Sequence, residues 1–425
     1  MATLAINGGS KVVERDIGSP WPVYDDREKD ALISVLESRR WGRSGYDYQN
    51  RKGSALYQFE QAFADFHDGT YALSVATGTT ALETCMRVVG VEAGCEVIVP
   101  ACTYIASASC AMVCNGIPIF VDVNPGNYTI DPKAVEAAIT PRTRAVVAVD
   151  FGGMPCDTDA LGEICRKRGI ALVSDCSHAH GGQWRSKGVG SFADIAGYSC
   201  MPGKVLAIGE GGMVMTQDED LYEKAFRYQH AGRDRGEVSR AFTWPATTLR
   251  LSEWEAAIGL VALTRLEEQA EIRWRNVRYL ADGMAQIPGL SGLEIDERVT
   301  RWNPYCWHFM FISAEFEGIH RDVFRKALAA EGVQCGLGPT EPLYRYDIFR
   351  SGKWGKTGCP IRCPLYEGEV DYTKVHCPEA ERIHDTEALL ISHRFLLGPL
   401  EDMDLILCAM RKIRDNVDEL RGAAS

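Results

Sequence analysis

The amino-acid sequence predicts an α/β fold in which a large domain is built on a mostly parallel sheet and a smaller α+β domain follows. Short apolar runs alternate with helix-like segments between about residues 70 and 216, which is typical of a parallel sheet with helices on both faces. A long helical pattern from Leu251 to about Leu280 then leads into the C-terminal third. Since 425 residues suffice for two hydrophobic cores, we place the domains at residues 1–270 and 271–425.

Seven apolar runs in the first half are predicted to be buried strands. They are short, rich in Val, Ile and Ala, and followed by Gly, Pro, Asp or Thr. They lack polar alternation, which favours strands covered on both faces. The runs cover residues 71–75, 96–101, 118–123, 145–150, 171–175, 195–200 and 212–216.

Apolar residues recur at helical spacing between these strands. The stripes cover residues 81–89, 134–138 and 161–165, and two earlier helices are predicted at 26–37 and 57–66. Because parallel strands end at the same edge of a sheet, residues that directly follow the strands are expected to lie together.

The composition is that of an ordinary globular protein, with 46% apolar and 24% charged residues. A formal net charge of -12 leaves no basic excess for nucleic acid or an anionic membrane surface, so we expect neither partner. No apolar run reaches transmembrane length. Residues 1–9 lack the basic and apolar regions of a signal peptide, and we expect a cytoplasmic protein.

Fifteen cysteines are many for a chain without a secretory signal, and free reduced thiols are the expected state. Cys359, Cys363, His376 and Cys377 could suggest a metal cluster. Their spacing, interrupted by prolines, matches no standard zinc site, so we expect no metal.

Two candidate cofactor contacts follow the first two strands. Gly78, Thr79 and Thr80 stand between a strand and a helix, where backbone N–H groups and hydroxyls suit a phosphate. A turn with an N-cap is the ordinary alternative for such a segment. Tyr104 follows the next strand, where it could stack on a flat ring or belong to the core.

Two further candidates carry charge. Asp175 ends an apolar run, and a carboxylate there is unfavourable unless it has a partner such as a pyridinium nitrogen; an N-cap is the alternative. His178 follows in the next turn. Lys204 comes 29 residues after Asp175 (204 minus 175), one helix–strand unit later, in a loop flanked by Gly and Pro that favours a neutral amine. Ser199 precedes it and could donate to a phosphate.

Taken in this order, the residues resemble the DegT/StrS-type sugar aminotransferases, a family within fold type I of the pyridoxal 5'-phosphate (PLP) enzymes, the aspartate-aminotransferase-like fold. The resemblance covers nearly the whole chain. The matching segments are Gly78-Thr79-Thr80-Ala81-Leu82, Pro100-Ala101-Cys102-Thr103-Tyr104, Asp175 with His178-Ala179-His180-Gly181, Ser199 through Lys204 into Gly209-Glu210-Gly211-Gly212, Arg250-Leu251-Ser252-Glu253, Cys377-Pro378-Glu379-Ala380-Glu381-Arg382 and His393.

The resemblance implies a role for each position. Lys204 would hold PLP as a Schiff base and move protons, Asp175 would pair with the pyridine nitrogen, and His178 would contact the ring's 3-hydroxyl. Tyr104 would stack on the ring. The phosphate would be held by Gly78, Thr79, Thr80 and Ser199.

Other positions bear on the partner subunit and the substrate. Thr248 stands where the family commonly has an Asn that reaches the neighbouring subunit's phosphate, and the resemblance implies a homodimer with a shared site. Cys200 and Met201, just before the lysine, and the segment 150–153 also depart from the family pattern. The candidates for the substrate pocket are Trp41, Arg43, Tyr344 and His393.

The function that the resemblance implies is transfer of an amino group from glutamine or glutamate to a keto-sugar or keto-cyclitol, as in antibiotic or amino-sugar biosynthesis. The opening Ala5-Ile6-Asn7-Gly8-Gly9 looks most like the branch that aminates scyllo-inosose, and also like aminohydroxybenzoate synthases. PLP-dependent aromatisation or elimination stays open, as does a non-catalytic regulatory homologue. A nicotinamide-binding fold is disfavoured, because no G-x-G-x-x-G follows the first strand.

Overall fold

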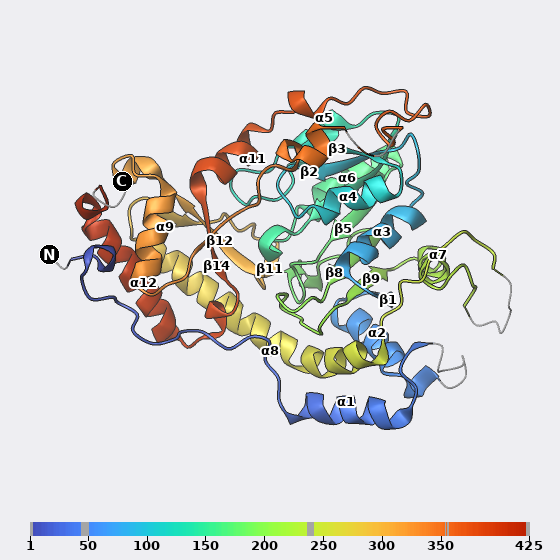
Figure 1. Cartoon of the computed structure of the whole chain (residues 1–425), viewed down its shortest axis with the longest axis horizontal. Helices are drawn as coiled ribbons and strands as arrows, with labels where there is room; N and C mark the ends of the chain where they lie inside the picture. The colour runs from blue at the N-terminus through green and yellow to red at the C-terminus, as the bar shows by residue number, and fades with distance from the viewer. Residues whose placement is uncertain (1–2, 44–50, 236–241, 353, 355–356, 422–425) are drawn as a thin grey trace.

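The computed structural model describes residues 3–43, 51–235, 242–352, 354 and 357–421. A seven-stranded sheet with the order β1-β9-β8-β5-β4-β2-β3 forms the centre of the large domain (Figure 1). Six strands of this sheet point in the same direction, and β9, which lies between β8 and the edge strand β1, runs antiparallel to both. This confirms the predicted α/β class with its mostly parallel sheet. The strands are β1 Tyr71–Val75, β2 Glu96–Pro100, β3 Ile117–Val121, β4 Thr143–Val149, β5 Ala171–Asp175, β8 Ile195–Ser199 and β9 Gly212–Thr216.

Helices cover both faces of this sheet, as the unbroken apolar strands predict. Val97 and Val99 of β2 pack into one hydrophobic core, whereas Ile98 between them packs into another with Leu161. Successive side chains of a strand point to opposite faces, so both faces are buried. The helices of the large domain are α2 Ala55–Phe66, α3 Gly78–Val88, α4 Ala106–Val113, α5 Pro132–Ala138, α6 Thr158–Arg168 and α7 Glu219–Gln229.

The smaller domain has an antiparallel sheet with the order β10-β12-β14-β13. Its strands are β10 Leu290–Gly292, β12 Cys306–Phe311, β13 Gly336–Leu337 and β14 Ala388–Ser392, and its helices are α9 Arg321–Ala330, α10 Asp347–Arg350, α11 Pro378–Arg382 and α12 Leu400–Asp415. A third small sheet joins β11 Val299–Arg301 to the β6 Gln183–Trp184 and β7 Lys187–Gly188 hairpin of the large domain. The two domains are therefore also linked away from the main sheet.

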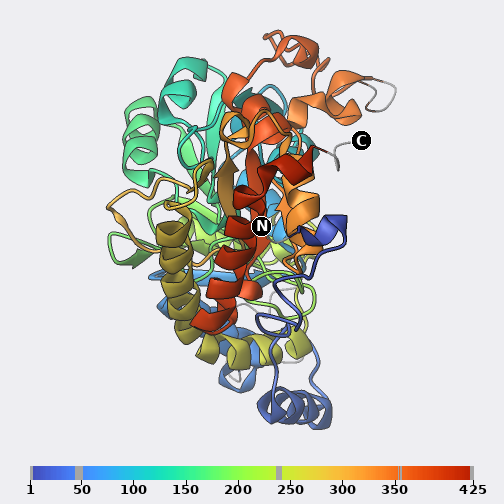
Figure 2. The ribbon, with the colours of Figure 1, turned by 90° about the vertical axis from the view of Figure 1, so that its left-hand side faces the viewer.

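The 32-residue helix α8, Glu253–Met284, connects the domains and runs from below the large domain to the small one (Figure 1). Residue 270 lies within this helix, so the boundary between residues 270 and 271 stays a prediction. The helix α1, Asp26–Ser38, lies beside α8. The chain before α1 lies against α12 in the small domain (Figure 2), where Lys412 donates to the Ser10 carbonyl and pairs with Glu331.

All fifteen cysteines are free, and eleven of them are buried. Within the described ranges, no three His, Cys, Asp or Glu side chains come together as a group that could hold a metal ion. In the described part of the chain, no helix is both long enough and apolar enough to cross a membrane.

Candidate active site

A cavity of about 480 Å³ lies where strands β5 and β8 of the main sheet end. β5 ends with Asp175 and β8 with Ser199, because parallel strands present their carboxyl ends at one edge. The cavity brings together seven of the residues that the sequence singles out as catalytic or cofactor-binding. They are Gly78, Thr79, Tyr104, Asp175, His178, Ser199 and Lys204.

The N-terminus of α3 forms one side of the cavity. Thr77 and Thr80 make a reciprocal capping box, in which each side chain accepts a hydrogen bond from the other's backbone N–H, at 3.1 and 2.9 Å. The hydroxyl of Thr80 is thereby engaged, and Thr80 does not line the cavity, whereas Thr79 does. A Cβ on Gly78 would lie 2.4 Å from the Cβ of Ser199, so only glycine lets the helix approach β8 this closely.

Asp175 is buried among neutral hydrogen-bond donors. Its Oδ1 accepts from the backbone N–H of Ser177 at 3.1 Å, and its Oδ2 accepts from the hydroxyl of Ser107 at 2.7 Å. The Ser107 hydroxyl is in turn 2.9 Å from that of Thr103. No cationic side chain among the described residues lies within ion-pair distance of Asp175. A buried carboxylate of this kind favours a cationic ligand group.

His178 is a neutral donor. Burial lowers its pKa well below the ordinary value, and the charge of Lys204 acts in the same direction. The backbone N–H of Gly152 donates to Nδ1 at 3.2 Å, so the ring proton must be on Nε2. His178 therefore offers an N–H group to whatever occupies the cavity.

Lys204 lies in the loop between β8 and β9, and burial lowers its pKa from the ordinary 10.5 to about 8. Two side chains from outside the large-domain sheet hold this loop. Trp21 donates through Nε1 to the carbonyl of Pro202 at 2.9 Å, and His393 donates through Nε2 to that of Gly203 at 3.0 Å. The N-terminal segment and the small domain thus both fix the position of the lysine.

Tyr104 lines the cavity with a ring that is 59% exposed. A large aromatic face is seldom left so open, and this one can cover a flat ligand.

The remaining predicted residues do not line this cavity. Trp41 is exposed and lies against Trp254, and Thr248 is exposed in a bridge to His230. Arg43 is buried in an ion pair with Glu60. Residues 44–50, which follow it, lie outside the described residues.

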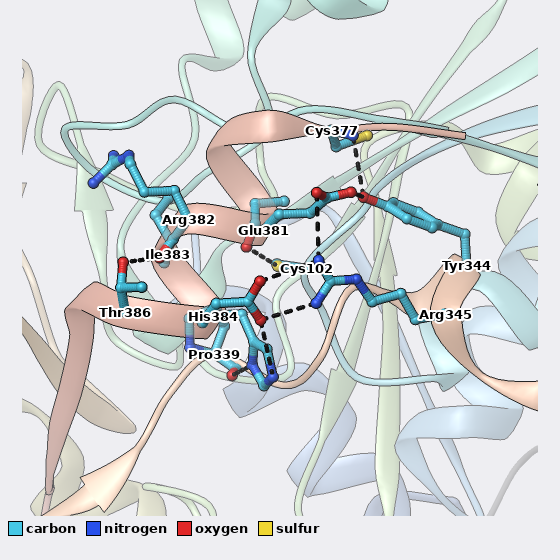
Figure 3. Close-up of polar contacts among 12 residues, drawn as sticks. Cys102, Pro339, Tyr344, Arg345, Cys377, Glu381, Arg382, Ile383, His384 and Thr386 are labelled. Carbon is cyan, nitrogen blue, oxygen red and sulfur yellow. Dashed lines mark hydrogen bonds and ion pairs between the residues drawn. The ribbon is translucent and has the colours of Figure 1, made fainter. Parts of the chain in front are cut away.

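Tyr344 and His393 act on the loops around the cavity. Tyr344 donates to Glu381 and accepts from the backbone N–H of Cys377 (Figure 3). His393 accepts at Nδ1 from Arg273 at 3.4 Å while it donates to the lysine loop. Both side chains are already satisfied within the protein.

The small domain supplies a second wall of the cavity that the sequence did not reveal. It consists of Tyr305, Cys306, His308, Leu390 and residues 337–340, and Phe151 adjoins it from the end of β4. The ring of His308 stacks on that of Phe151 with centroids 4.9 Å apart, and burial lowers the pKa of His308 to about 3. Phe151 directly follows a predicted strand, and this position could have identified it as a cavity residue. No local sequence pattern marks the small-domain residues of this wall.

A network of polar contacts holds residues 338–345 in place over the large domain (Figure 3). Arg345 pairs with Asp385 through both nitrogens, at 2.9 and 3.1 Å, and His384 donates to the carbonyl of Pro339 at 3.0 Å. Thr340 donates to the Thr103 carbonyl at 2.8 Å. This part of the cavity wall is therefore held by contacts with both domains.

Comparison with known proteins identifies a matching family, similar chains and a similar solved structure. The profile of the DegT/DnrJ/EryC1/StrS aminotransferase family matches residues 26–361. The chain is 33% identical over 431 residues to L-glutamine:scyllo-inosose aminotransferase of Streptomyces griseus, covering 99% of both chains. It is 34% identical over 433 residues to L-glutamine:2-deoxy-scyllo-inosose aminotransferase of Micromonospora echinospora, covering 99% of this chain and 100% of the relative. The crystal structure of 3-amino-5-hydroxybenzoic acid synthase superposes with a TM-score of 0.81 at 32% identity, covering 93% of this chain and 99% of the other.

Proposed function

The chain belongs to the DegT/DnrJ/EryC1/StrS aminotransferase family, and on that premise we propose that it moves an amino group from glutamine to a keto-cyclitol, with PLP held covalently by Lys204. Two relatives that match over nearly their whole length are named for glutamine as donor and a scyllo-inosose as acceptor. The pathway that we propose is aminocyclitol antibiotic biosynthesis. The observation that carries the proposal is a buried lysine with a lowered pKa that shares one cavity with a buried carboxylate, and this carboxylate pairs with no cationic side chain of the described residues.

The cavity residues fit PLP. The N-terminus of α3 and the hydroxyls of Thr79 and Ser199 suit its phosphate. Asp175 has no cationic partner among the described residues and therefore suits a protonated ring nitrogen. The exposed face of Tyr104 suits the ring itself. When bound, PLP takes up the amino group and withdraws electrons from the carbon that bears it.

The protein's own groups then have distinct tasks. With its pKa near 8, Lys204 is partly neutral at physiological pH and can both take up and return a proton at Nζ. In the tautomer that Gly152 fixes, the Nε2–H group of His178 would donate to an oxygen of the bound ring. Asp175, hydrogen-bonded by Ser107, keeps the opposite side of the site negative.

The small-domain wall is our candidate for the acceptor-binding side. Phe151, His308 and Pro339 present rings and apolar surface with few polar groups, which suits the C–H face of a polyhydroxylated ring. Among the described lining residues Lys204 is the one basic side chain apart from histidines, so an uncharged acceptor is favoured.

The test combines cofactor mapping with substrate turnover. Borohydride reduction followed by peptide mass mapping should place PLP on Lys204, and a Lys204→Arg variant should carry no reduced adduct. Glutamine should convert the bound cofactor to its aminated form, and scyllo-inosose should reverse that change. An adduct on another lysine, or no spectral response to any keto-cyclitol or keto-sugar, would refute the assignment.

Aromatisation is the second candidate, because the solved 3-amino-5-hydroxybenzoic acid synthase shares the fold over 93% of this chain at 32% identity. Its chemistry would need the same lysine. An aromatic product formed from a cyclic precursor without any amino donor would favour it over transamination.

We also propose a homodimer. Thr248 and Arg250 are exposed and do not line the cavity of their own chain. Arg250 bridges to Val75, the last residue of β1. Residues so placed could contribute to the site of a second copy. Sedimentation should give twice the mass of the 46.9 kDa chain. A cytoplasmic location stays a prediction from the sequence.

A further inference from the structure

The amine of Lys204 has one close side-chain neighbour that no sequence motif indicates. Nζ lies 4.2 Å from the centre of the Tyr305 ring. Within the described residues, neither a hydrogen bond nor a carboxylate at ion-pair distance holds Nζ. A buried lysine is seldom left with an aromatic face as its contact, so Tyr305 calls for an explanation.

The ring of Tyr305 is itself held in position. It stacks on His178 with centroids 4.4 Å apart, and on His393 at 6.0 Å, with interplanar angles of 28° and 27°. Its backbone N–H donates to Gly152 at 3.2 Å, and its carbonyl accepts from the N–H of His393 at 3.3 Å. The ring therefore forms a fixed surface that faces the lysine.

Opposing influences act on the charge of Lys204. Burial favours the neutral amine, and Asp175 favours the ammonium form. The negative face of an aromatic ring also favours the ammonium form and attracts it. The titratable groups around Nζ come from several elements: Asp175, His178 and His180 in and after β5, Cys200 after β8, Cys306 of β12, and His393 after β14.

We propose that Tyr305 is a positioning residue, whose ring face holds the amine of Lys204 inside the cavity whenever Lys204 is not bonded to PLP. The inference rests on the proposed function of Lys204. A lysine side chain has four rotatable carbon bonds, and holding it in one region costs conformational entropy. A fixed ring that attracts the ammonium group offsets this cost and keeps the proton carrier beside Asp175 and His178.

The experiment measures the pKa of Lys204 in the PLP-free chain. Trace labelling with acetic anhydride over a pH series, read by mass spectrometry of the Lys204 peptide, reports the fraction of neutral amine. Tyr305→Leu removes the π face and should lower the pKa of Lys204 by about one unit, which raises the fraction of neutral amine at pH 7 about fivefold. Tyr305→Phe keeps the face and should match the unmodified chain.

Phe151→Leu is the matched control, since this ring belongs to the same cavity but does not contact Lys204; it should leave the pKa of Lys204 unchanged. An unchanged or raised pKa in Tyr305→Leu overturns the proposal. So does an equal fall in Tyr305→Phe, which would assign the effect to the hydroxyl. Circular dichroism checks that each variant folds.

The labelling result is independent of the cofactor. If borohydride places PLP on Lys204 and Tyr305→Leu leaves the pKa unchanged, the inference about Tyr305 fails while the proposed function stands. If PLP is fixed elsewhere, the proposed function fails, and the pKa of Lys204 still shows whether Tyr305 holds its amine.

Discussion

Replacing Lys204 with Met should make the PLP-free chain more stable at pH 7, because burial makes the ammonium group of Lys204 costly in the folded state. The pKa of Lys204 is lowered from 10.5 to about 8. At about 1.36 kcal/mol per pKa unit, this difference corresponds to about 3 kcal/mol. Methionine has a similar length and no charge, so the variant avoids that cost. Lys204 therefore serves the proposed activity while it lowers the stability of the folded chain.

The sign of the pH dependence follows from the same values. Well below pH 8 the lysine is mostly protonated in both the folded and the unfolded chain, and nearly the full cost is present. Between pH 8 and 10.5 the unfolded chain binds the proton that the folded chain has released, so the stability of the unmodified chain rises with pH. The advantage of Lys204→Met should therefore decline over this window and vanish above it.

Calorimetry of the two PLP-free proteins at pH 7, 9 and 10.5 is the assay. For 425 residues at about 2.1 cal/mol/K each, 3 kcal/mol corresponds to a rise in Tm of about 3 to 4 °C at pH 7. Lys187→Met, at an exposed site, should leave Tm unchanged. A Tm difference that is absent at pH 7, or the same at all three pH values, would refute the reasoning.

Three further predictions concern the cofactor site. Asp175→Asn should lower kcat by more than about 100-fold, because the negative charge opposite the ring nitrogen is lost; steady-state assays with glutamine measure this, and near-normal turnover would contradict it. Ser107→Ala removes the 2.7 Å hydrogen bond to Asp175, leaves that buried carboxylate with one donor fewer, and should weaken PLP binding about tenfold or more in a titration of the PLP-free chain. Gly78→Ala places a Cβ 2.4 Å from that of Ser199 and should weaken PLP binding by at least about tenfold, whereas Gly162→Ala, with nothing within 4 Å, should not change it.

Much of the fold could be predicted from local patterns. Each of the seven predicted strands is present within two residues at either end, and the helix predicted from Leu251 runs from Glu253 to Met284. These segments are long or strongly apolar, so burial alone selects their structure. The link of β6 and β7 to β11 could not be predicted, because two-residue strands leave no periodicity to detect.

The phosphate turn illustrates how far local chemistry reaches. The sequence places Gly78, Thr79 and Thr80 together at a helix start, and all three suit a phosphate. Which hydroxyl faces the cavity depends on the cap, because Thr80 pairs with Thr77 and leaves Thr79 at the cavity. Arg43 is a second residue whose role could not be predicted from its residue type. An arginine can bind a substrate, but Arg43 instead pairs with the carboxylate of Glu60 on α2.

The sequence by itself determined which residues stand together at the carboxyl ends of the strands. Asp175 ends β5, Ser199 ends the neighbouring parallel strand β8, and Lys204 follows β8 in the next loop. The chain direction brings these positions to one edge of the sheet whatever the rest of the molecule does. Only the tertiary structure decided what faces them. Tyr305 and His308 come from more than 100 residues further along the chain, and their approach depends on how the small domain packs, which no local pattern encodes.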